Sequence, residues 1–152
     1  MRVESKLADL EIELPETPHP MANYVPAVTT GNLVFISGHG PTRPGGTFIT
    51  GKVGRDLTIE EGYEAARVTM LNCLSTLKAE IGDLDRVRRI VKLFGMVNCT
   101  EEFTEPPAVI NGASDLLVAI FGDAGRHARS AVGMHALPRS IAVEIEMVVE
   151  IA

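Results

Sequence analysis

The sequence has no tryptophan, few aromatic residues, few cysteines and fewer basic than acidic residues. Aromatic residues make up 5% of its 152 residues, and 14 Lys and Arg against 20 Asp and Glu give a net charge of −6. Binding to nucleic acid needs a concentrated basic face, often with interleaved aromatic rings, so this composition argues against nucleic acid as the main partner. The longest basic cluster, residues 86–92, lies within an apolar strand pattern and is interpreted as a solvent-facing strand surface.

The two cysteines, Cys73 and Cys99, are too few for a disulfide framework and show no paired metal-ligand spacing. We expect them to be free thiols in a reducing compartment. No apolar run reaches the roughly 20 residues that a membrane span needs. Residues 1–14 contain no signal-peptide core. These features predict a soluble, cytoplasmic protein without a membrane partner.

Two patterns that suggest ligands at first sight do not persist. No pair of histidines has the i,i+4 spacing of a helical zinc site, and no cluster of Cys or carboxylate residues completes one, so we expect no metal. Residues 46–52 begin like a phosphate-binding P-loop, but Val53 stands where a Ser or Thr would hold Mg²⁺. The residues between the two glycines are also strand-like, so we reject this motif.

The length predicts a single domain over residues 1–152 that can bury a conventional core. Its first part, residues 1–22, is expected to be an N-terminal extension, with one or two helical turns over 5–12. The core over 23–152 begins with strands at 24–29 and 33–37 around a hairpin turn centred on Gly31. A short third strand is expected at 47–50.

Helical patterns follow. Thr58 and Glu61 have the spacing of a capping box, and apolar residues recur every three or four positions up to Ile81, which predicts a long helix ending at Gly82. After a strand over 87–97, two prolines open a second helix over 106–121.

Two strands, 129–137 and 141–151, end the chain and are expected to pair as a hairpin. The order ββ(β)αβαββ predicts an α+β fold in which both helices cover one face of a sheet. In the last strand, aliphatic residues alternate with Glu144, Glu146 and Glu150, so the glutamates should lie on the face away from the helices.

Arg129 is conspicuous in a chain that is short of positive charge. Alternation along 129–137 predicts that it shares the face of the strand glutamates. One interpretation is a structural ion pair with Glu146 or Glu150. The other is that its planar guanidinium binds a substrate carboxylate, with Ala131 and Gly133 leaving room for the ligand.

Five short segments stand in the order and near-spacing of one known family: Tyr24-Val25, residues 31–38 (GNLVFISG), Asn111, Ala128-Arg129-Ser130 and Val143-Glu144-Ile145-Glu146. In these segments, from Tyr24 to the C-terminus, the sequence resembles the RidA/YjgF family. Its members are reactive-intermediate (imine and enamine) deaminases, also labelled L-PSP endoribonuclease-like. The resemblance implies a chorismate-mutase-like fold and a homotrimer with ligand clefts between subunits.

The resemblance also implies an activity and a site. Family members hydrolyse small 2-imino acids to 2-oxo acids and ammonia, and need no metal or organic cofactor. On the matching positions, Arg129 would bind the substrate carboxylate and Glu144 would position or activate the attacking water. The implied substrate-binding residues are Tyr24, Ser37, Gly38, Asn111 and Ala131.

Several departures from the family pattern indicate a divergent branch. Ala131 replaces a frequent Cys, His127 a common Pro and His39 a frequent Gln. In the expected terminal hairpin, Glu144 would lie about 13 Å along the strand from Arg129, with Glu146 nearer. Either the pairing differs, or Glu144 approaches across a subunit boundary, or Glu146 serves the site.

Three functions follow from these observations. The first is hydrolytic deamination of 2-imino and enamino acids in a trimer. The second is a non-catalytic protein that binds a small carboxylate metabolite through Arg129. The third is the endoribonuclease activity of the family label, against which the net charge of −6 counts.

Overall fold

The computed structural model describes residues 2–17 and 22–152. In chain order, its helices and strands are α1 (Val3–Asp9), β1 (Ala27–Thr30), β2 (Leu33–His39), α2 (Ile59–Ile81), β3 (Val87–Asn98), α3 (Pro106–Phe121), β4 (Ala128–Met134) and β5 (Val143–Ile151). Three short 3₁₀ turns join them: η1 (Leu84–Arg86), η2 (Gly122–Gly125) and η3 (Pro138–Ser140).

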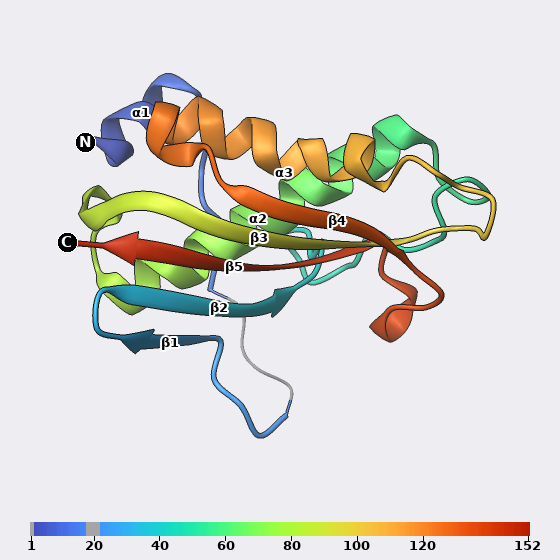
Figure 1. Cartoon of the computed structure of the whole chain (residues 1–152), viewed down its shortest axis with the longest axis horizontal. Coiled ribbons are helices and arrows are strands. Elements are labelled where there is room, and N and C mark those ends of the chain that lie inside the picture. Colours follow the sequence, from blue (N-terminus) through green and yellow to red (C-terminus); the bar gives the residue numbers. More distant parts are fainter. Residues whose placement is uncertain (1, 18–21) are drawn as a thin grey trace.

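The strands form one five-stranded sheet in the order β1-β2-β5-β3-β4. All neighbours are antiparallel except β3 and β4, which are parallel. Helices α2 and α3 pack against each other on one face of this sheet (Figure 1). The α+β class with helices on one face is therefore confirmed.

The expected terminal hairpin is wrong. Strand β3 lies between β4 and β5, so residues 129–137 do not pair with 141–151. Helix α3 carries the chain from β3 over the sheet to β4, which is the crossover that a parallel pair requires. Turn η3 then leads to β5 on the other side of β3. Strands joined by a short connection are often neighbours in a sheet, but this is only a tendency. Here β4 and β5 are joined by a short connection and are nevertheless separated by β3.

Local signals placed the helices well. The Thr58 hydroxyl accepts a hydrogen bond from the Glu61 backbone N–H at 3.1 Å, and the Glu61 carboxylate accepts one from the Thr58 N–H at 3.0 Å. This capping box begins α2, and Gly82 ends it with φ of +85°. Both predicted long helices are confirmed.

Three local predictions need correction. The first helix spans Val3–Asp9 rather than 5–12, and its Val3 and Leu7 are buried with the rest of the core. The segment 47–50 is not a strand, since only isolated bridges join Phe48 to Thr42 and Thr50 to Ile141. Strand β1 begins at Ala27, so Tyr24 precedes it in a bend.

The core lies between the sheet and the two long helices. In β5 the aliphatic residues are buried against the helices while Glu146 is exposed, as alternation predicts. The stretch Pro106–Gly125 is long and apolar enough to cross a membrane, but the helix packs on α2 and the sheet, which accounts for its composition. The largest fully buried side chains include Met70, Leu74, Leu93, Ile110, Leu117, Ile145 and Met147.

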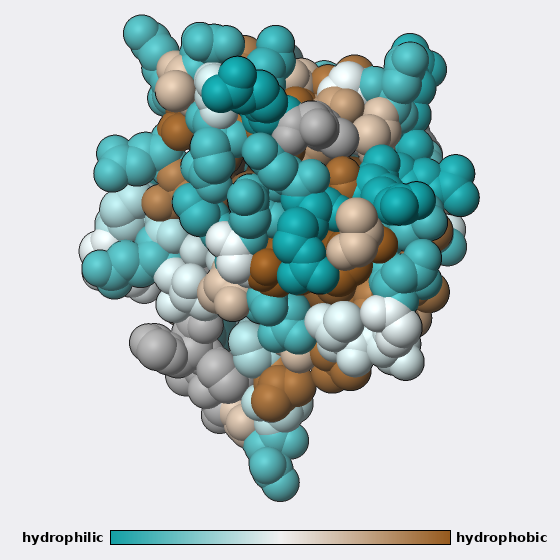
Figure 2. Space-filling view, turned by 90° about the vertical axis from the view of Figure 1, so that its left-hand side faces the viewer, coloured by the Kyte–Doolittle hydropathy of each residue, from teal (hydrophilic) through white to brown (hydrophobic). Residues whose placement is uncertain are grey.

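The polar surface of the molecule is interrupted by apolar areas. Helix α1 and the end of β5 lie at the same end of the sheet in Figure 1. Figure 2 looks at this end, where hydrophilic residues dominate and hydrophobic residues reach the surface in patches. Other exposed apolar residues, among them Val28 and Phe35, lie on the face of the sheet away from the helices.

We expect Thr58→Ala to lower the free energy of unfolding by about 1 kcal/mol, because the first turn of α2 loses its hydroxyl cap. Urea denaturation measures this difference. Thr58→Ser keeps the hydroxyl and should stay near wild type, and Thr104→Ala provides a control at an exposed threonine. Equal loss in all three variants would contradict the capping role.

Candidate functional site

An irregularity in β2 creates the first part of the site. Ile36 pairs with Met147 and His39 pairs with Ile145, so three steps along β2 oppose two along β5. The extra residue forms a β-bulge at Ser37–Gly38, a device that re-aims backbone near functional sites. Ser37 is held there because both its backbone N–H and its hydroxyl donate to the Pro26 carbonyl at 3.0 Å.

The bulge brings the backbone of Gly38 against the side chain of Glu144. A Cβ atom added to Gly38 would lie 3.1 Å from the carboxyl carbon of Glu144 and closer still to one of its oxygens. A side chain at residue 38 would displace the Glu144 carboxylate from this position. Ser37 and Gly38 therefore lie beside Glu144 within one chain.

Glu144 has the electrostatics of a group that exchanges protons. The carboxyl is half-buried, and its pKa is raised from the ordinary value first by desolvation and then by the neighbouring charge of Glu146. Within residues 2–17 and 22–152, no donor is hydrogen-bonded to this carboxylate. A raised pKa makes a carboxyl a better general acid and base near neutral pH.

A cavity of about 480 Å³ opens beside this carboxylate, and we name it the Glu144 cavity. Tyr24 lines it, although β1 starts only later in the chain. Because Tyr24, Ser37, Gly38 and Glu144 line one cavity, the structure brings together four of the residues expected in the site. The lining also includes His39, Phe48, Asn72, Arg139 and Ile141.

Helix α2 holds the loop that follows β2. The Nδ1 atom of His39 lies 2.6 Å from the Ser37 carbonyl oxygen, and Nε2 lies 2.7 Å from the Thr76 hydroxyl. Since a carbonyl only accepts, Nδ1 carries the proton and the Thr76 hydroxyl donates to Nε2. Burial lowers the pKa of His39, which favours this neutral form. Asn72 donates to the carbonyls of Gly40 at 3.1 Å and Thr42 at 3.0 Å.

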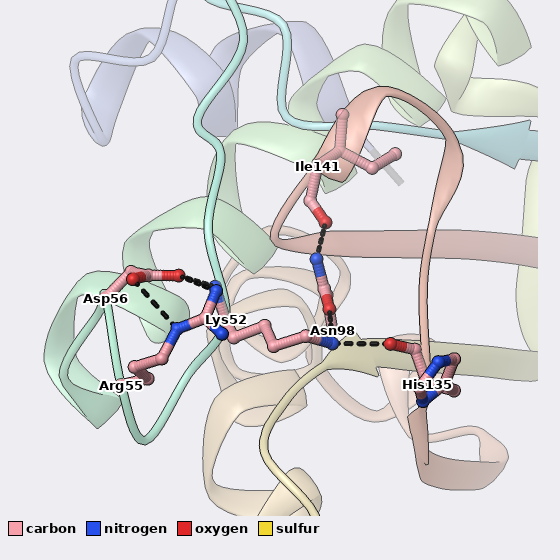
Figure 3. Close-up of polar contacts among 6 residues, drawn as sticks. All are labelled: Lys52, Arg55, Asp56, Asn98, His135 and Ile141. Carbon is pink, nitrogen blue, oxygen red and sulfur yellow. Dashed lines mark hydrogen bonds and ion pairs between the residues drawn. The ribbon is translucent and has the colours of Figure 1, made fainter.

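A second polar cluster, shown in Figure 3, holds the segment before β5 that lines the Glu144 cavity. The Lys52 ammonium donates to the Asn98 side-chain oxygen at 2.8 Å and to the His135 carbonyl. Asn98 in turn donates to the Ile141 carbonyl at 3.1 Å. These bonds tie the segment between β4 and β5, which contributes Arg139 and Ile141 to the cavity wall. Lys52, from the rejected P-loop pattern, therefore has a structural role.

Arg129 and Asn111 line a different cavity, of about 630 Å³, between α3 and the start of β4. We name it the Arg129 cavity; Ser114 and Arg126 also line it. The guanidinium donates from Nη1 to the Ser114 hydroxyl at 3.0 Å and from Nη2 to the Pro107 carbonyl at 3.4 Å. Arg129 thus contacts α3, on the helix-covered face of the sheet.

The expected position of Arg129 on the glutamate face is wrong. Leu93 of β3 is level with Arg129 on one side and with the buried Met147 on the other, so all three point toward the helices. Glu144 is level with Met96, three residues further along β3, and points to the opposite face. The alternation in β4 predicted the wrong face for Arg129 because β4 is an edge strand and neither of its faces is strongly apolar.

The structural ion pair suggested for Arg129 is also absent from the described chain. Glu150 pairs with Arg89 at 3.0 Å, and no ion pair within residues 2–17 and 22–152 involves Arg129. The space expected beside the arginine is partly filled, since a Cβ on Gly133 would lie 2.8 Å from the Cys99 sulfur. Ala131 packs against the core and lines neither cavity.

Sequence reasoning missed the supporting polar residues. Asn72 and Thr76 are buried in α2, and Ser114 lies in α3, where the helical pattern predicts only packing. A polar residue inside the buried stripe of a helix was the available signal. In the part of the chain that the structure describes, no group of three His, Cys, Asp or Glu residues is arranged to hold a metal ion.

Glu144→Gln should raise the melting temperature by a few degrees at pH 7. The folded-state pKa of Glu144 lies above its unfolded value, so its contribution to stability is full below the unfolded pKa and is lost as pH rises through the folded pKa. The advantage of the variant should therefore shrink toward pH 4. Calorimetric melting measures it, with the exposed Glu102→Gln as control. A variant that melts below wild type at pH 7 would argue against an unfavourable charge at residue 144.

Comparison with known proteins agrees with the fold. A family model described as "YjgF/chorismate mutase-like, putative endoribonuclease" matches residues 4–150. TCP17 of Trypanosoma cruzi is 46% identical over 99% of this chain and 94% of its own length. A structure from Shewanella oneidensis, described as a putative endoribonuclease, is 35% identical with a TM-score of 0.95, covering 99% of this chain and 100% of its own.

A more distant structure extends the comparison. RidA from the Antarctic bacterium Psychrobacter sp. is 26% identical with a TM-score of 0.64, and the match covers 90% of this chain and 94% of that one. With a family model that spans nearly the whole sequence and relatives that match almost end to end, the chain belongs to the YjgF/RidA family.

Proposed function

We propose that this protein hydrolyses small 2-imino and enamino acids to 2-oxo acids and ammonia, at sites that form between the subunits of a homotrimer. The observation that carries this proposal is the separation of Arg129 and Glu144. They line two cavities on opposite faces of the sheet, whereas the carboxylate and the imine of a 2-imino acid are adjacent groups. One small substrate reaches both residues only if they come from different copies.

The open face of the sheet supports association. Val28 and Phe35 pair across β1 and β2, and they are 51% and 46% exposed. Val25, which precedes them, is 58% exposed. Together with Phe94 and Val148 they line a hollow of about 260 Å³ on the face away from the helices. Exposed apolar groups of this kind mark interaction surfaces, and a partner subunit would cover them.

The chemistry needs little beyond orientation and one proton-transfer group. Arg129 of one subunit would hold the carboxylate by charge-assisted hydrogen bonds, with Asn111 beside it. The substrate reacts as its N-protonated iminium form, and Glu144 of the partner would take a proton from water as the water adds to the iminium carbon, which gives a neutral carbinolamine. Glu144 then returns this proton to the amine, and the C–N bond breaks as the carbinolamine hydroxyl gives its own proton to Glu144. This releases ammonia and leaves the 2-oxo acid, and ammonia carries the last proton away as ammonium, which restores the Glu144 carboxylate. Ser37, Gly38 and Tyr24 would line the imine end, whereas Ala131, which lines neither cavity, has no place in the proposed site.

Two alternatives give different results in the same assays. A non-catalytic carboxylate-binding protein would bind 2-oxo acids without accelerating imine hydrolysis. An endoribonuclease, as the family description and the Shewanella relative suggest, would cleave RNA in the trimer fraction and lose that activity with Arg129→Ala. The acidic side chain of Asp115 in the Arg129 cavity and the net charge of −6 disfavour a polyanion there.

We propose that the protein acts in the cytoplasm, in keeping with free Cys73 and Cys99.

We expect Arg129→Ala and Glu144→Gln to reduce imine hydrolysis in different ways. Arg129→Ala loses the carboxylate anchor and should raise KM about tenfold or more. Glu144→Gln loses the proton-transfer group and should lower kcat about 100-fold. Imine is generated in situ by an amino-acid oxidase, and oxo-acid formation is followed. Rates in both variants equal to wild type would refute this catalytic site.

Mixing the two inactive variants tests the intersubunit site directly. When Arg129→Ala and Glu144→Gln chains are co-expressed with different tags and purified as mixed oligomers, some clefts combine an intact Arg129 with an intact Glu144. Part of the activity should therefore return. Its recovery depends on subunit mixing and not on either chain alone.

The matched control combines Arg129→Ala with Asn111→Ala. Both residues lie in the Arg129 cavity, so every mixed cleft lacks one of them. The activity of the mixture should therefore not exceed that of the Arg129→Ala and Asn111→Ala proteins measured separately. Complementation in this control, or its absence in the Arg129→Ala and Glu144→Gln mixture, would contradict a site shared between subunits. Light scattering establishes whether the particle is a trimer.

A further inference from the structure

A chain of hydrogen bonds runs from the backbone to the guanidinium of Arg129. The Nδ1 atom of His127 lies 2.7 Å from the Gly125 carbonyl oxygen. Because a carbonyl only accepts, Nδ1 carries the ring proton in the neutral imidazole and Nε2 keeps its lone pair. Nε2 lies 2.9 Å from the Ser114 hydroxyl oxygen, so Ser114 donates to His127.

The direction of this hydrogen bond decides what Ser114 offers to Arg129. With its proton committed to His127, the hydroxyl presents its lone pairs elsewhere, and Arg129 donates to it from Nη1 at 3.0 Å. Burial, and secondarily the positive charge of Arg129, lower the pKa of His127, which favours the neutral ring. The order of donation is therefore Arg129 to Ser114 to His127, with Gly125 fixing the ring.

The Ser114 bond is the better of the two that hold the guanidinium. The other, from Nη2 to the Pro107 carbonyl, is 3.4 Å long. Both acceptors belong to α3. Among the residues that the structure describes, the other N–H groups of Arg129 have no hydrogen-bond partner, so they can bind a ligand in the Arg129 cavity. Planar, two-point recognition of a carboxylate depends on the orientation of the guanidinium plane.

We propose that Ser114 and His127 are positioning residues that orient Arg129 for the substrate carboxylate. We name the hydrogen-bonded series from Arg129 through Ser114 to His127 the relay. The identity of the ligand rests on the proposed function, whereas the relay is a property of this chain. His127 acts through Ser114, and Ser114 acts through Arg129. The relay accounts for two polar side chains that packing alone does not require on α3 and before β4.

The same pair does not have the surroundings of a nucleophile and its base. Ser114 lies inside α3, where backbone N–H groups are used in helical hydrogen bonds and leave no pair of donors for an oxyanion. Its oxygen is also occupied by the Arg129 guanidinium. A positioning role therefore fits better than covalent catalysis.

The first test measures the affinity of the purified protein for pyruvate by calorimetry. Ser114→Ala should raise the Kd about tenfold, and the KM for imine in parallel, with a much smaller change in kcat. Ser114→Thr restores the hydroxyl and should recover binding. His127→Leu should weaken binding severalfold, and His127→Gln, which offers an acceptor near the Nε2 position, should recover part of it.

Coupling separates a relay from general destabilisation. Since His127 acts only through Ser114, His127→Leu should have no further effect on the pyruvate Kd in a Ser114→Ala background. Ser5→Ala, at an exposed serine outside both cavities, is the control for loss of a hydroxyl. Independent, additive effects of the two substitutions would overturn the proposal, as would labelling of Ser114 by a fluorophosphonate.

Nitrogen-15 NMR tests the relay without any ligand. We expect the His127 ring at neutral pH to be protonated on Nδ1 and bare on Nε2, and the Arg129 side-chain N–H resonance to shift in Ser114→Ala. The opposite tautomer, or an unchanged Arg129 resonance, would overturn the relay. If wild type neither binds pyruvate nor hydrolyses imines, the proposed function fails, while these two resonances still decide whether Ser114 and His127 hold Arg129.

Discussion

The central position of β5, bonded to β2 on one side and β3 on the other, is the constraint on which the rest of the structure depends. Strict alternation along β5 buries one face against α2 and α3 and turns its glutamates to the other face. The bulge in β2 brings the strand close to Glu144, and Gly38 leaves room for the carboxylate there. A half-buried carboxylate with a raised pKa is the chemical consequence.

The crossover through α3 has an equally direct consequence for Arg129. A parallel partner for β3 must arrive from above the sheet, so the start of β4 lies beneath the helix that delivers it. Arg129 points toward that helix and finds the hydroxyl of Ser114. The same topology that builds the fold therefore separates the cation from the carboxylate. A second subunit is the simplest way to reunite them on one substrate.

The two cavities also differ in how they are supported. Around Glu144, polar residues on α2 and the Lys52–Asn98 pair hold backbone segments, so the walls are fixed by buried and part-buried hydrogen bonds. Around Arg129, the support reaches a charged side chain through Ser114 and His127. Backbone walls suit the small, uncharged end of a substrate, and an oriented guanidinium suits its carboxylate.

The sequence by itself determined the two long helices, most of the strands, and six residues of the two cavities: Tyr24, Ser37, Gly38, Asn111, Arg129 and Glu144. These depend on local signals: the capping box at Thr58, the alternation in β5 and the short motifs around Gly38, Arg129 and Glu144. Only the tertiary structure decided which strands are neighbours, which face Arg129 occupies and which polar groups support the site. Local periodicity is blind to these, because strand order and the orientation of an edge strand depend on contacts between residues far apart in the chain.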